Sequence, residues 1–494
     1  MKKSLSILSA LAIVLSLTAC SGNSEISVSS EGSVSSEGSV SSEGSNETES
    51  TVQTGITIQA ESSTPSSTSA PDEKPAANNS AKLGEFQKTA TIAETVMMDE
   101  GGVKISATGL KYNNYAIELE LLIENNSAKD LSFISGSMGY CCNSINGIMV
   151  SDGYLSCDVA AGKKATDSIS FDYNGLMLYG INEVADIEIG FDIRDDDYNH
   201  TYSGPRKIKT SIADSFNYNE NRYQTAISSD EFKNTYNYSI EHFSAEELYN
   251  ENGLKVVSSA IITNKDGDKA LLLEAVNSSS EQITLVTSRI GINGLLVENE
   301  NWTYDTINPE KTCIIDVKLS DIMRDSYWDI YGIKDIGELA LDIETKRADD
   351  SVITEAKTIT VKLSDTKGEF DASGKEVYSG NGVRILSKGI AESGSEYSKD
   401  MYALFIIENT NAEKITVDDV YNSLSVNGFM CDYSFPYTTL DPNGYAMLEV
   451  KLWESSLEKN KIATVSDITE IEVSADIKNN SGEKLDSPII KVQY

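Results

Sequence analysis

The chain of 494 residues has few residues of the types that usually carry catalysis: only 2 are histidine and 6 are cysteine. His200 and His242 have no cysteine or serine partner at a recognisable spacing, and the Gly-x-Ser-x-Gly motif is absent. No glycine-rich phosphate loop follows a predicted strand. None of the 77 acids stands out as half of a glycosidase pair. We therefore expect no catalytic residue, no cofactor and no enzyme activity.

Basic residues are also scarce, with 40 lysines and arginines against 77 acids and a formal net charge of −37. Nucleic-acid binding requires a basic surface, so the composition excludes that class of partner. It also disfavours direct docking on anionic lipid headgroups. The acidity is typical of a secreted protein kept soluble by its charge, and a specific cationic partner is the alternative.

After Cys20 the cysteines are too few, and odd in number, for a disulfide framework. They are Cys141, Cys142, Cys157, Cys313 and Cys431. A hairpin is predicted between the first three, so Cys157 can pair with Cys141 or Cys142. The alternative is that all are buried free thiols acting as small apolar residues.

The sequence also predicts no metal site. Adjacent cysteines lack the usual zinc spacing. Two acidic clusters, residues 192–197 and 264–268, lack the pattern of a calcium loop. Both fall where hairpins should turn, so we expect solvated turn acids there.

The N-terminus is typical of a secretory signal, with Lys2 and Lys3 followed by an apolar stretch over residues 5–17. That stretch is too short for the roughly 20 apolar residues of a membrane span. We predict a signal peptide over residues 1–19. The cleavage motif consists of Leu17, Thr18, Ala19 and Cys20. It resembles the lipobox of bacterial lipoproteins, which implies lipidation of Cys20, a stable membrane anchor and an extracytoplasmic chain.

Residues 20–83 are of low complexity and follow the predicted cleavage site. The hexapeptide Ser-Val-Ser-Ser-Glu-Gly occurs three times between Ser27 and Gly44, and no aromatic residue is present. Such a segment cannot bury enough apolar area to offset its chain entropy. It is predicted to be a disordered tether.

The remaining chain shows a threefold internal repeat, which we place at residues 84–212, 213–366 (with an N-terminal linker) and 367–494. In each copy a strand after a glycine precedes a strand that ends in asparagine, and an Asn-Gly pair follows. The landmarks are Gly102, Gly253 and Gly382, then Asn125, Asn277 and Asn409, then Asn146, Asn293 and Asn427.

The landmarks favour β structure. Residues 117–124 alternate apolar and polar side chains with one interruption, as a half-buried strand does. Asn-Gly between apolar runs is a strong hairpin signal. About seven strands fall in each copy, and only residues 322–327 and 455–460 favour short crossover helices. We predict an all-β fold of three tandem immunoglobulin-like β-sandwich repeats.

The chain is similar to bacterial lipoproteins of the Gram-positive type, whose tandem immunoglobulin-like domains have no assigned function. The likeness rests on the lipobox, the Ser/Glu-rich tether and three units of strand, asparagine, polar turn and strand. These units are residues 121–127, 273–279 and 405–411. The resemblance implies a cell-surface module that binds proteins. Ser21 after the cysteine also suits a Gram-negative outer membrane.

Three functions follow from these observations. The first is a non-catalytic interaction or adhesion protein with an extracytoplasmic protein partner. The second is a carbohydrate- or peptide-binding module, with Trp302 and Tyr304 as candidates for stacking on a sugar. Core packing is the usual role of tryptophan, and Trp328 and Trp453 lie in the predicted crossover regions. The third and least favoured is an envelope hydrolase.

Overall fold

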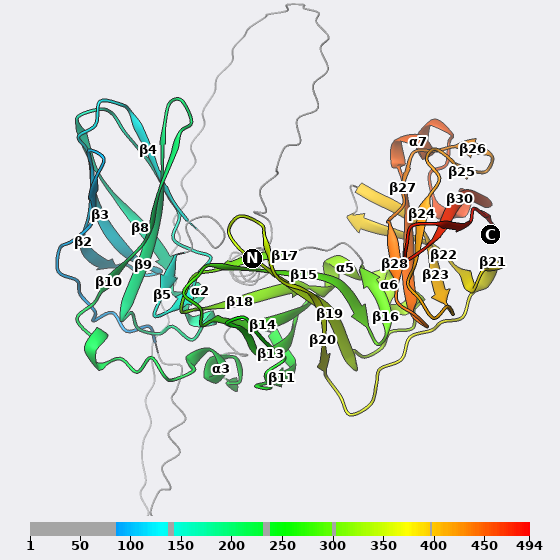
Figure 1. Ribbon diagram of the computed structural model, residues 1–494, viewed down its shortest axis with the longest axis horizontal. Helices are drawn as coiled ribbons and strands as arrows, with labels where there is room; N and C mark the ends of the chain where they lie inside the picture. Colours follow the sequence, from blue (N-terminus) through cyan, green and yellow to red (C-terminus); the bar gives the residue numbers. More distant parts are fainter. Residues whose placement is uncertain (1–84, 137–142, 231–237, 299–302, 396–397) are drawn as a thin grey trace, which may run out of the picture. The chain divides into compact units, whose positions relative to one another are not determined.

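The computed structural model describes residues 85–136, 143–230, 238–298, 303–395 and 398–494 (Figure 1). Strands dominate these ranges, and each described helix has six residues or fewer. The predicted all-β class is confirmed. No helix in this part of the chain is long and apolar enough to cross a membrane.

The helices and strands fall into three groups that follow the predicted repeats. Up to residue 212 they are β1 (Thr95–Glu100), β2 (Val103–Tyr112), β3 (Ala116–Asn125), β4 (Leu131–Ser135), β5 (Ser144–Ile145), β6 (Ile148–Met149), β7 (Leu155–Val159), β8 (Lys163–Asp172), α2 (Tyr173–Leu178), β9 (Asp186–Asp195) and β10 (His200–Lys209). From residue 213 to 366 they are η1 (Ala213–Ser215), α3 (Arg222–Ile227), β11 (Tyr238–Ser244), β12 (Tyr249–Glu251), β13 (Leu254–Asn264), β14 (Lys269–Asn277), β15 (Ile283–Ile292), β16 (Leu295–Glu298), β17 (Thr303–Ile307), β18 (Lys311–Lys318), α5 (Leu319–Ile322), α6 (Asp325–Ile330), β19 (Glu338–Lys346) and β20 (Val352–Lys362). From residue 367 they are β21 (Lys375–Gly380), β22 (Val383–Ser395), β23 (Ser398–Asn409), β24 (Ile415–Asp419), β25 (Ser425–Val426), β26 (Phe429–Met430), β27 (Tyr433–Ser434), β28 (Thr438–Leu440), β29 (Tyr445–Leu452), α7 (Glu454–Lys459), η2 (Val465–Asp467), β30 (Glu470–Asn479), β31 (Lys484–Asp486) and β32 (Ile489–Gln493).

The predicted alternation over residues 117–124 becomes the central strand β3. Its apolar residues Ile117, Leu119, Leu121 and Ile123 are buried, and β3 pairs antiparallel with both β2 and β8. One face of the strand is therefore in a core, while Glu120 on the other face is exposed. This is the expected pattern of an antiparallel sheet that is wet on one side.

The same three-strand antiparallel ladder occurs three times along the chain. It is β2-β3-β8, then β13-β14-β18, then β22-β23-β29. Each central strand ends in a fully buried asparagine: Asn125, Asn277 or Asn409. The side-chain amide of Asn277 donates to the carbonyls of Glu281 and Ile307, and its oxygen accepts from the Ser279 N–H. Asn125 and Asn409 make equivalent contacts with the turn after their own strand.

The described strands form four sheets, and two of these run from one predicted repeat into the next. The 11-stranded sheet joins strands of the first and second, and the 10-stranded sheet joins strands of the second and third. The buried apolar residues form three clusters. Within this part of the chain, the cores are thus linked by shared backbone ladders.

The helices α6 and α7 lie where short helices were predicted, but α2 and α3 were not predicted. Residues 173–178 read Tyr-Asn-Gly-Leu-Met-Leu, and asparagine and glycine are poor helix formers. A capping contact compensates, because the Asp172 side chain accepts from the N–H groups of Asn174 and Gly175. The helix α3 falls in the predicted linker, and its Tyr223 and Ile227 join the first cluster.

Candidate interaction site

The three Asn-Gly pairs have the backbone of tight hairpins, with positive φ at both residues of each pair. Side-chain hydrogen bonds fix the turns. The amide of Asn293 donates to the Asp335 carbonyl at 2.8 Å, and its oxygen accepts from the N–H groups of Gly337 and Glu338. Asn146 and Asn427 make the same three contacts, with Glu183, Ala185 and Asp186 and with Asp467, Thr469 and Glu470.

The first two hairpins each add a strand to a sheet farther along the chain. In β6, Ile148 lies beside Thr312 of β18 in a parallel pair. In β16, Leu295 lies beside Tyr445 of β29, again in parallel. Two separate parts of the chain thus use the same kind of backbone addition.

The register of the two additions is the same. Thr312 pairs across its own sheet with the residue before Asn277, and Tyr445 pairs with the residue before Asn409. Ile148 and Leu295 each follow the glycine of their hairpin directly. Equivalent residues therefore meet at both additions.

Apolar packing accompanies each addition. Met149 of β6 and Leu295 of β16 are fully buried. Leu272 and Ile314, on β14 and β18, pack in the first cluster together with residues of the first predicted repeat. Leu404, on β23, likewise packs in the second cluster. The sheet faces of the second and third ladders are therefore covered by the segment that precedes each of them.

Charged groups flank these contacts. The Lys311 ammonium lies 2.6 Å from a carboxylate oxygen of Glu188, and Lys207 lies 2.9 Å from the same oxygen. Burial acts to raise the pKa of Glu188, but the hydrogen bonds from the two lysines outweigh it and lower that pKa. Arg324 lies 2.6 Å from Glu449 and 4.5 Å from the ring centre of Tyr402.

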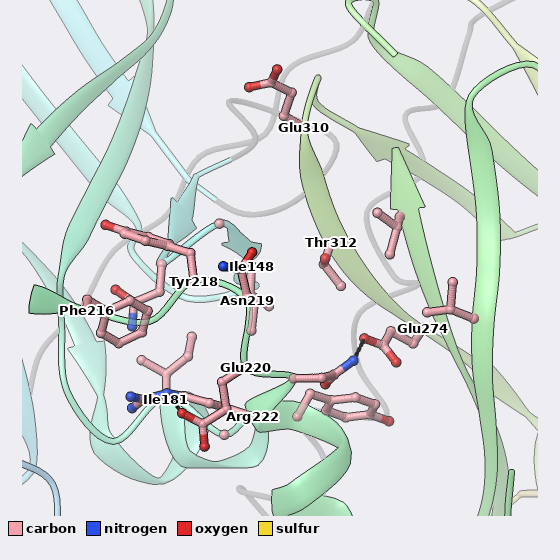
Figure 2. A pocket seen from close by; sticks show the side chains of 17 residues that line it. Ile148, Ile181, Phe216, Tyr218, Asn219, Glu220, Arg222, Glu274, Glu310 and Thr312 are labelled. Carbon is pink, nitrogen blue, oxygen red and sulfur yellow. Dashed lines mark hydrogen bonds and ion pairs between the residues drawn. The ribbon is translucent and has the colours of Figure 1, made fainter. Parts of the chain in front are cut away.

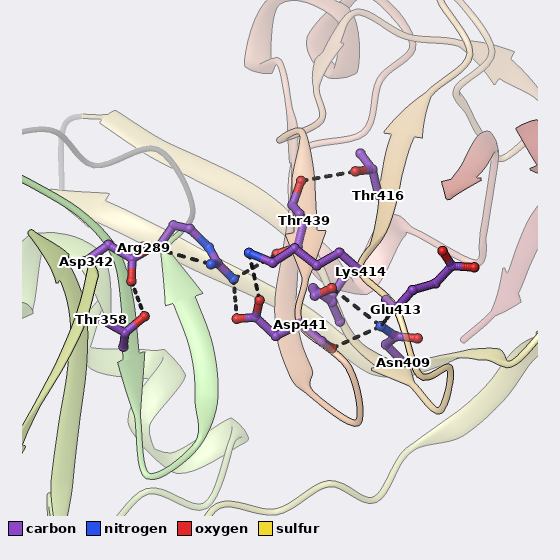
Figure 3. A network of polar contacts seen from close by, with 10 residues as sticks. Arg289, Asp342, Thr358, Asn409, Glu413, Lys414, Thr416, Thr439 and Asp441 are labelled. Carbon is purple, nitrogen blue, oxygen red and sulfur yellow. Dashed lines mark hydrogen bonds and ion pairs between the residues drawn. The ribbon is translucent and has the colours of Figure 1, made fainter. Parts of the chain in front are cut away.

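A second network joins the second and third predicted repeats (Figure 3). Arg289 contacts Asp441 at 2.7 Å and Asp342 at 3.4 Å, and Lys414 lies 3.0 Å from Asp441. Burial opposes ionisation of Asp441, but hydrogen bonds from Arg289 and Lys414 hold its pKa below the usual value. Charged side chains from distant parts of the sequence are thereby held together.

The third hairpin, β25–β26, differs from the first two because β26 stands at the end of its sheet order. In the described residues β26 pairs with β25 alone. Phe429 is 52% exposed and Met430 is 56% exposed. Trp453 is 49% exposed, and its backbone N–H donates to the Asp432 carbonyl, so it lies near the end of the hairpin. Figure 1 places β25, β26 and α7 together. We call Phe429, Met430 and Trp453 the hairpin patch.

A pocket of about 340 Å³ lies between residues 216–223 and strands β14 and β18 (Figure 2). Its charged groups already have partners. The Glu274 carboxylate accepts hydrogen bonds from Asn221, Gln224 and Ser258. The Arg222 guanidinium pairs with carboxylates and lies 4.4 Å from the Phe216 ring centre. The pocket offers contacts that hold the chain together rather than an unpaired charge for a ligand.

The candidates for sugar stacking are only partly described. Tyr304 on β17 is 46% exposed, with the Lys346 ammonium 5.5 Å from its ring centre. Trp302 lies outside the described residues. Trp328 packs against the second cluster, whereas Trp453, in the other predicted crossover, is exposed rather than part of a core.

The cysteine predictions are also met only in part by described residues. Cys157 has a free thiol and is half-buried in β7. Its two candidate partners, Cys141 and Cys142, lie outside the described residues, and the bridge stays a prediction. The signal peptide, Leu17, Thr18, Ala19, the lipidated Cys20 and the tether lie outside them as well.

The acidic clusters correct one expectation. Asp192 is not a solvated turn acid, since it is fully buried in β9 and bonds to Arg194 at 2.7 Å and His200 at 3.0 Å. Asp195, at the end of that strand, pairs with Lys129. In the ranges that the structure covers, no group of three or more histidine, cysteine or acidic residues is arranged to hold a metal ion.

Two buried carboxyl groups were not predicted from the sequence. Burial raises the pKa of Asp305 and of Asp316 to about 7 each. One oxygen of each carboxyl group is buried without a hydrogen-bond partner. A signal existed for Asp305, because it alternates with Thr303 and Ile307 on the buried face of β17.

Comparison with known proteins places the chain in no family. No family model matches it, and no curated protein matches it. A solved structure titled as an insight into host cell surface retention of a 1.5-MDa bacterial ice-binding adhesin has 12% identity and a TM-score of 0.13, covering 76% of this chain and 90% of that one. The exo-chitosanase CsxA of Amycolatopsis orientalis has 5% identity and a TM-score of 0.15, covering 82% and 78%. Scores this low carry no argument about fold or function.

Proposed function

We propose that the chain is a membrane-anchored, extracytoplasmic lipoprotein that presents three immunoglobulin-like β-sandwich repeats for protein–protein interaction or adhesion, without catalysis. The observation that carries the proposal is the hairpin patch. Two equivalent hairpins are covered by the next ladder, and the third exposes Phe429 and Met430. Exposed apolar side chains gathered at one place are typical of a protein-binding surface.

The threefold architecture in this proposal is supported by recurring contacts. The buried asparagine at the end of the central strand and the asparagine of the Asn-Gly hairpin make matching hydrogen bonds in all three copies. Two such side-chain networks at matching places in each copy favour one repeated domain. The lipobox-like motif before Cys20 supports the membrane anchor.

A carbohydrate- or peptide-binding module is the second candidate. One observation favours it: Tyr304 presents an exposed aromatic ring on β17, beside the Lys346 ammonium. Aromatic faces of this kind stack on apolar faces of ligands.

The anchor is tested in a bacterial host that processes lipoproteins. The chain and its Cys20→Ser variant are expressed with their own N-terminus and labelled with a clickable fatty acid. We expect the label and the membrane association for the chain alone, with Cys20→Ser released into the medium. Equal release of both would contradict the anchor.

The binding function is tested with beads that carry the full chain and with envelope surfaces of the producing bacterium. Protease treatment of those surfaces should abolish bead binding if the partner is a protein. Periodate treatment should abolish it if the partner is a glycan, and Tyr304→Ala should then weaken it. Beads that bind neither surface before treatment would contradict both candidates.

A further inference from the structure

The two internal hairpin additions define what a third hairpin of this type would bind. In each, the hairpin strand lies parallel to the edge strand of a three-strand ladder. The residue after the glycine faces the same register position, Thr312 or Tyr445. The unpaired backbone of an edge strand provides affinity, and the side chains beside it provide specificity.

The face beside the receiving strand is apolar in both cases. In the second ladder it presents Leu272 and Ile314, and in the third it presents Leu404 and Met447. These side chains are buried at 7% exposure or less. A hairpin carrying Phe429 and Met430 fits such a face, because both partners remove apolar surface from water.

The first ladder offers an open edge but the wrong chemistry. Its strand β8 ends the order of the four-stranded sheet. The positions equivalent to Leu272 and Ile314 are Glu120 and Thr166, by their pairing distance from the asparagine that ends each central strand. Both are exposed. Docking the hairpin patch there would bury a carboxylate against Phe429 without a partner, which is costly. A second copy of this chain is therefore a poor occupant, and the first repeat resembles the polar cap of a repeat array.

We propose that β26 docks in parallel on the open edge strand of a β-sandwich domain of a different protein, one whose face beside that strand is apolar. This inference rests on the proposed function and names the class of its partner. Trp453 stands where Arg324 stands in the second repeat, shortly after the strand that follows the hairpin. Arg324 contacts Tyr402 and Glu449 across the internal junction, so Trp453 adds an apolar contact at the same place in the external one.

The test supplies an edge of the stated chemistry. In the full chain, Glu120→Leu, Lys164→Thr and Thr166→Ile copy Leu272, Thr312 and Ile314 of the second ladder onto the first. This grafted chain is immobilised, and the unaltered full chain is passed over it in a binding assay. We expect binding about tenfold tighter than to an immobilised unaltered chain.

Controls separate the hairpin from other surfaces. Phe429→Asp with Met430→Lys in the passing chain should remove the gain. Tyr115→Asp, at an exposed aromatic residue of the first repeat, should keep it. Thermal unfolding of each variant checks that it folds.

Three outcomes would overturn the proposal. They are equal binding to grafted and unaltered chains, a gain that survives the double hairpin variant, and tight self-binding of the unaltered chain through Phe429, which would make a second copy the occupant. The assay needs no natural partner, so its failure leaves the bead experiment to judge the proposed function by itself.

Discussion

Leu295 lies beside Tyr445 in a parallel strand pair, although the two residues belong to different predicted repeats. The pairing explains why Leu295 is fully buried at the end of a hairpin. Ile148 and Thr312 are paired in the same way. Consecutive segments of this chain are therefore joined by backbone addition as well as by side-chain contact.

The equivalent residues Leu295 and Phe429 should respond differently to truncation. Leu295→Ala removes a buried side chain and should lower the free energy of unfolding by about 2–5 kcal/mol. Phe429→Ala should change it by about 0.5 kcal/mol or less, because Phe429 is largely exposed. Urea unfolding followed by circular dichroism measures both. Equal losses would show that β26 is covered within the chain.

The ion pair between Glu188 and Lys311 should be asymmetric. Lys311 is almost buried and has no other ion pair in the described part of the chain, whereas Glu188 also pairs with Lys207. Glu188→Gln leaves a buried ammonium with no countercharge and should cost about 3–5 kcal/mol. Lys311→Met should cost clearly less, because Lys207 remains beside the carboxylate. Urea unfolding of both variants and of the double variant gives the coupling, and a larger loss for Lys311→Met would contradict this account.

The buried asparagines allow a matched pair of neighbours. Asn125→Ala should lower the free energy of unfolding by about 2–4 kcal/mol, because it leaves the carbonyls of Lys129 and Val159 without their amide donor. Asn126→Ala is the control, since that side chain is exposed. Thermal and urea unfolding compare the two variants. A similar effect at both positions would mean that the network contributes little.

The hairpins were predictable because an Asn-Gly pair is a local signal: Asn146, Asn293 and Asn427 all adopt the positive φ that such turns require. The parallel additions were not predictable. They depend on the register between strands more than a hundred residues apart, which no local pattern encodes.

The covered sheet faces left a signal that the alternation rule did not use. In β3, glutamates separate the apolar residues, but β14 contains Ala270 to Leu273 as a continuous apolar run, and β23 contains residues 402–407 as another. Continuous runs are typical of strands buried on both faces. The difference between β3 and the two later strands therefore reports which ladder faces solvent.

Asp305 and Asp316 should make stability depend on pH. The folded pKa of each is about 7, well above the usual aspartate value of 3.8. Their stabilising contribution is thus complete below about pH 4 and is lost as the pH rises through 7, because the unfolded carboxyl group ionises first. Asp305→Asn should unfold at higher urea than the unaltered chain at pH 8, by roughly 2–4 kcal/mol, and at nearly the same urea at pH 4. Asp371 gives the opposite sign: hydrogen bonds from Lys388 and Ser373 hold its pKa at about 2, so Asp371→Asn should destabilise at neutral pH and lose its effect as the pH falls below 4. A constant difference between Asp305→Asn and the unaltered chain from pH 4 to 8 would contradict the burial of an uncharged carboxyl group in β17.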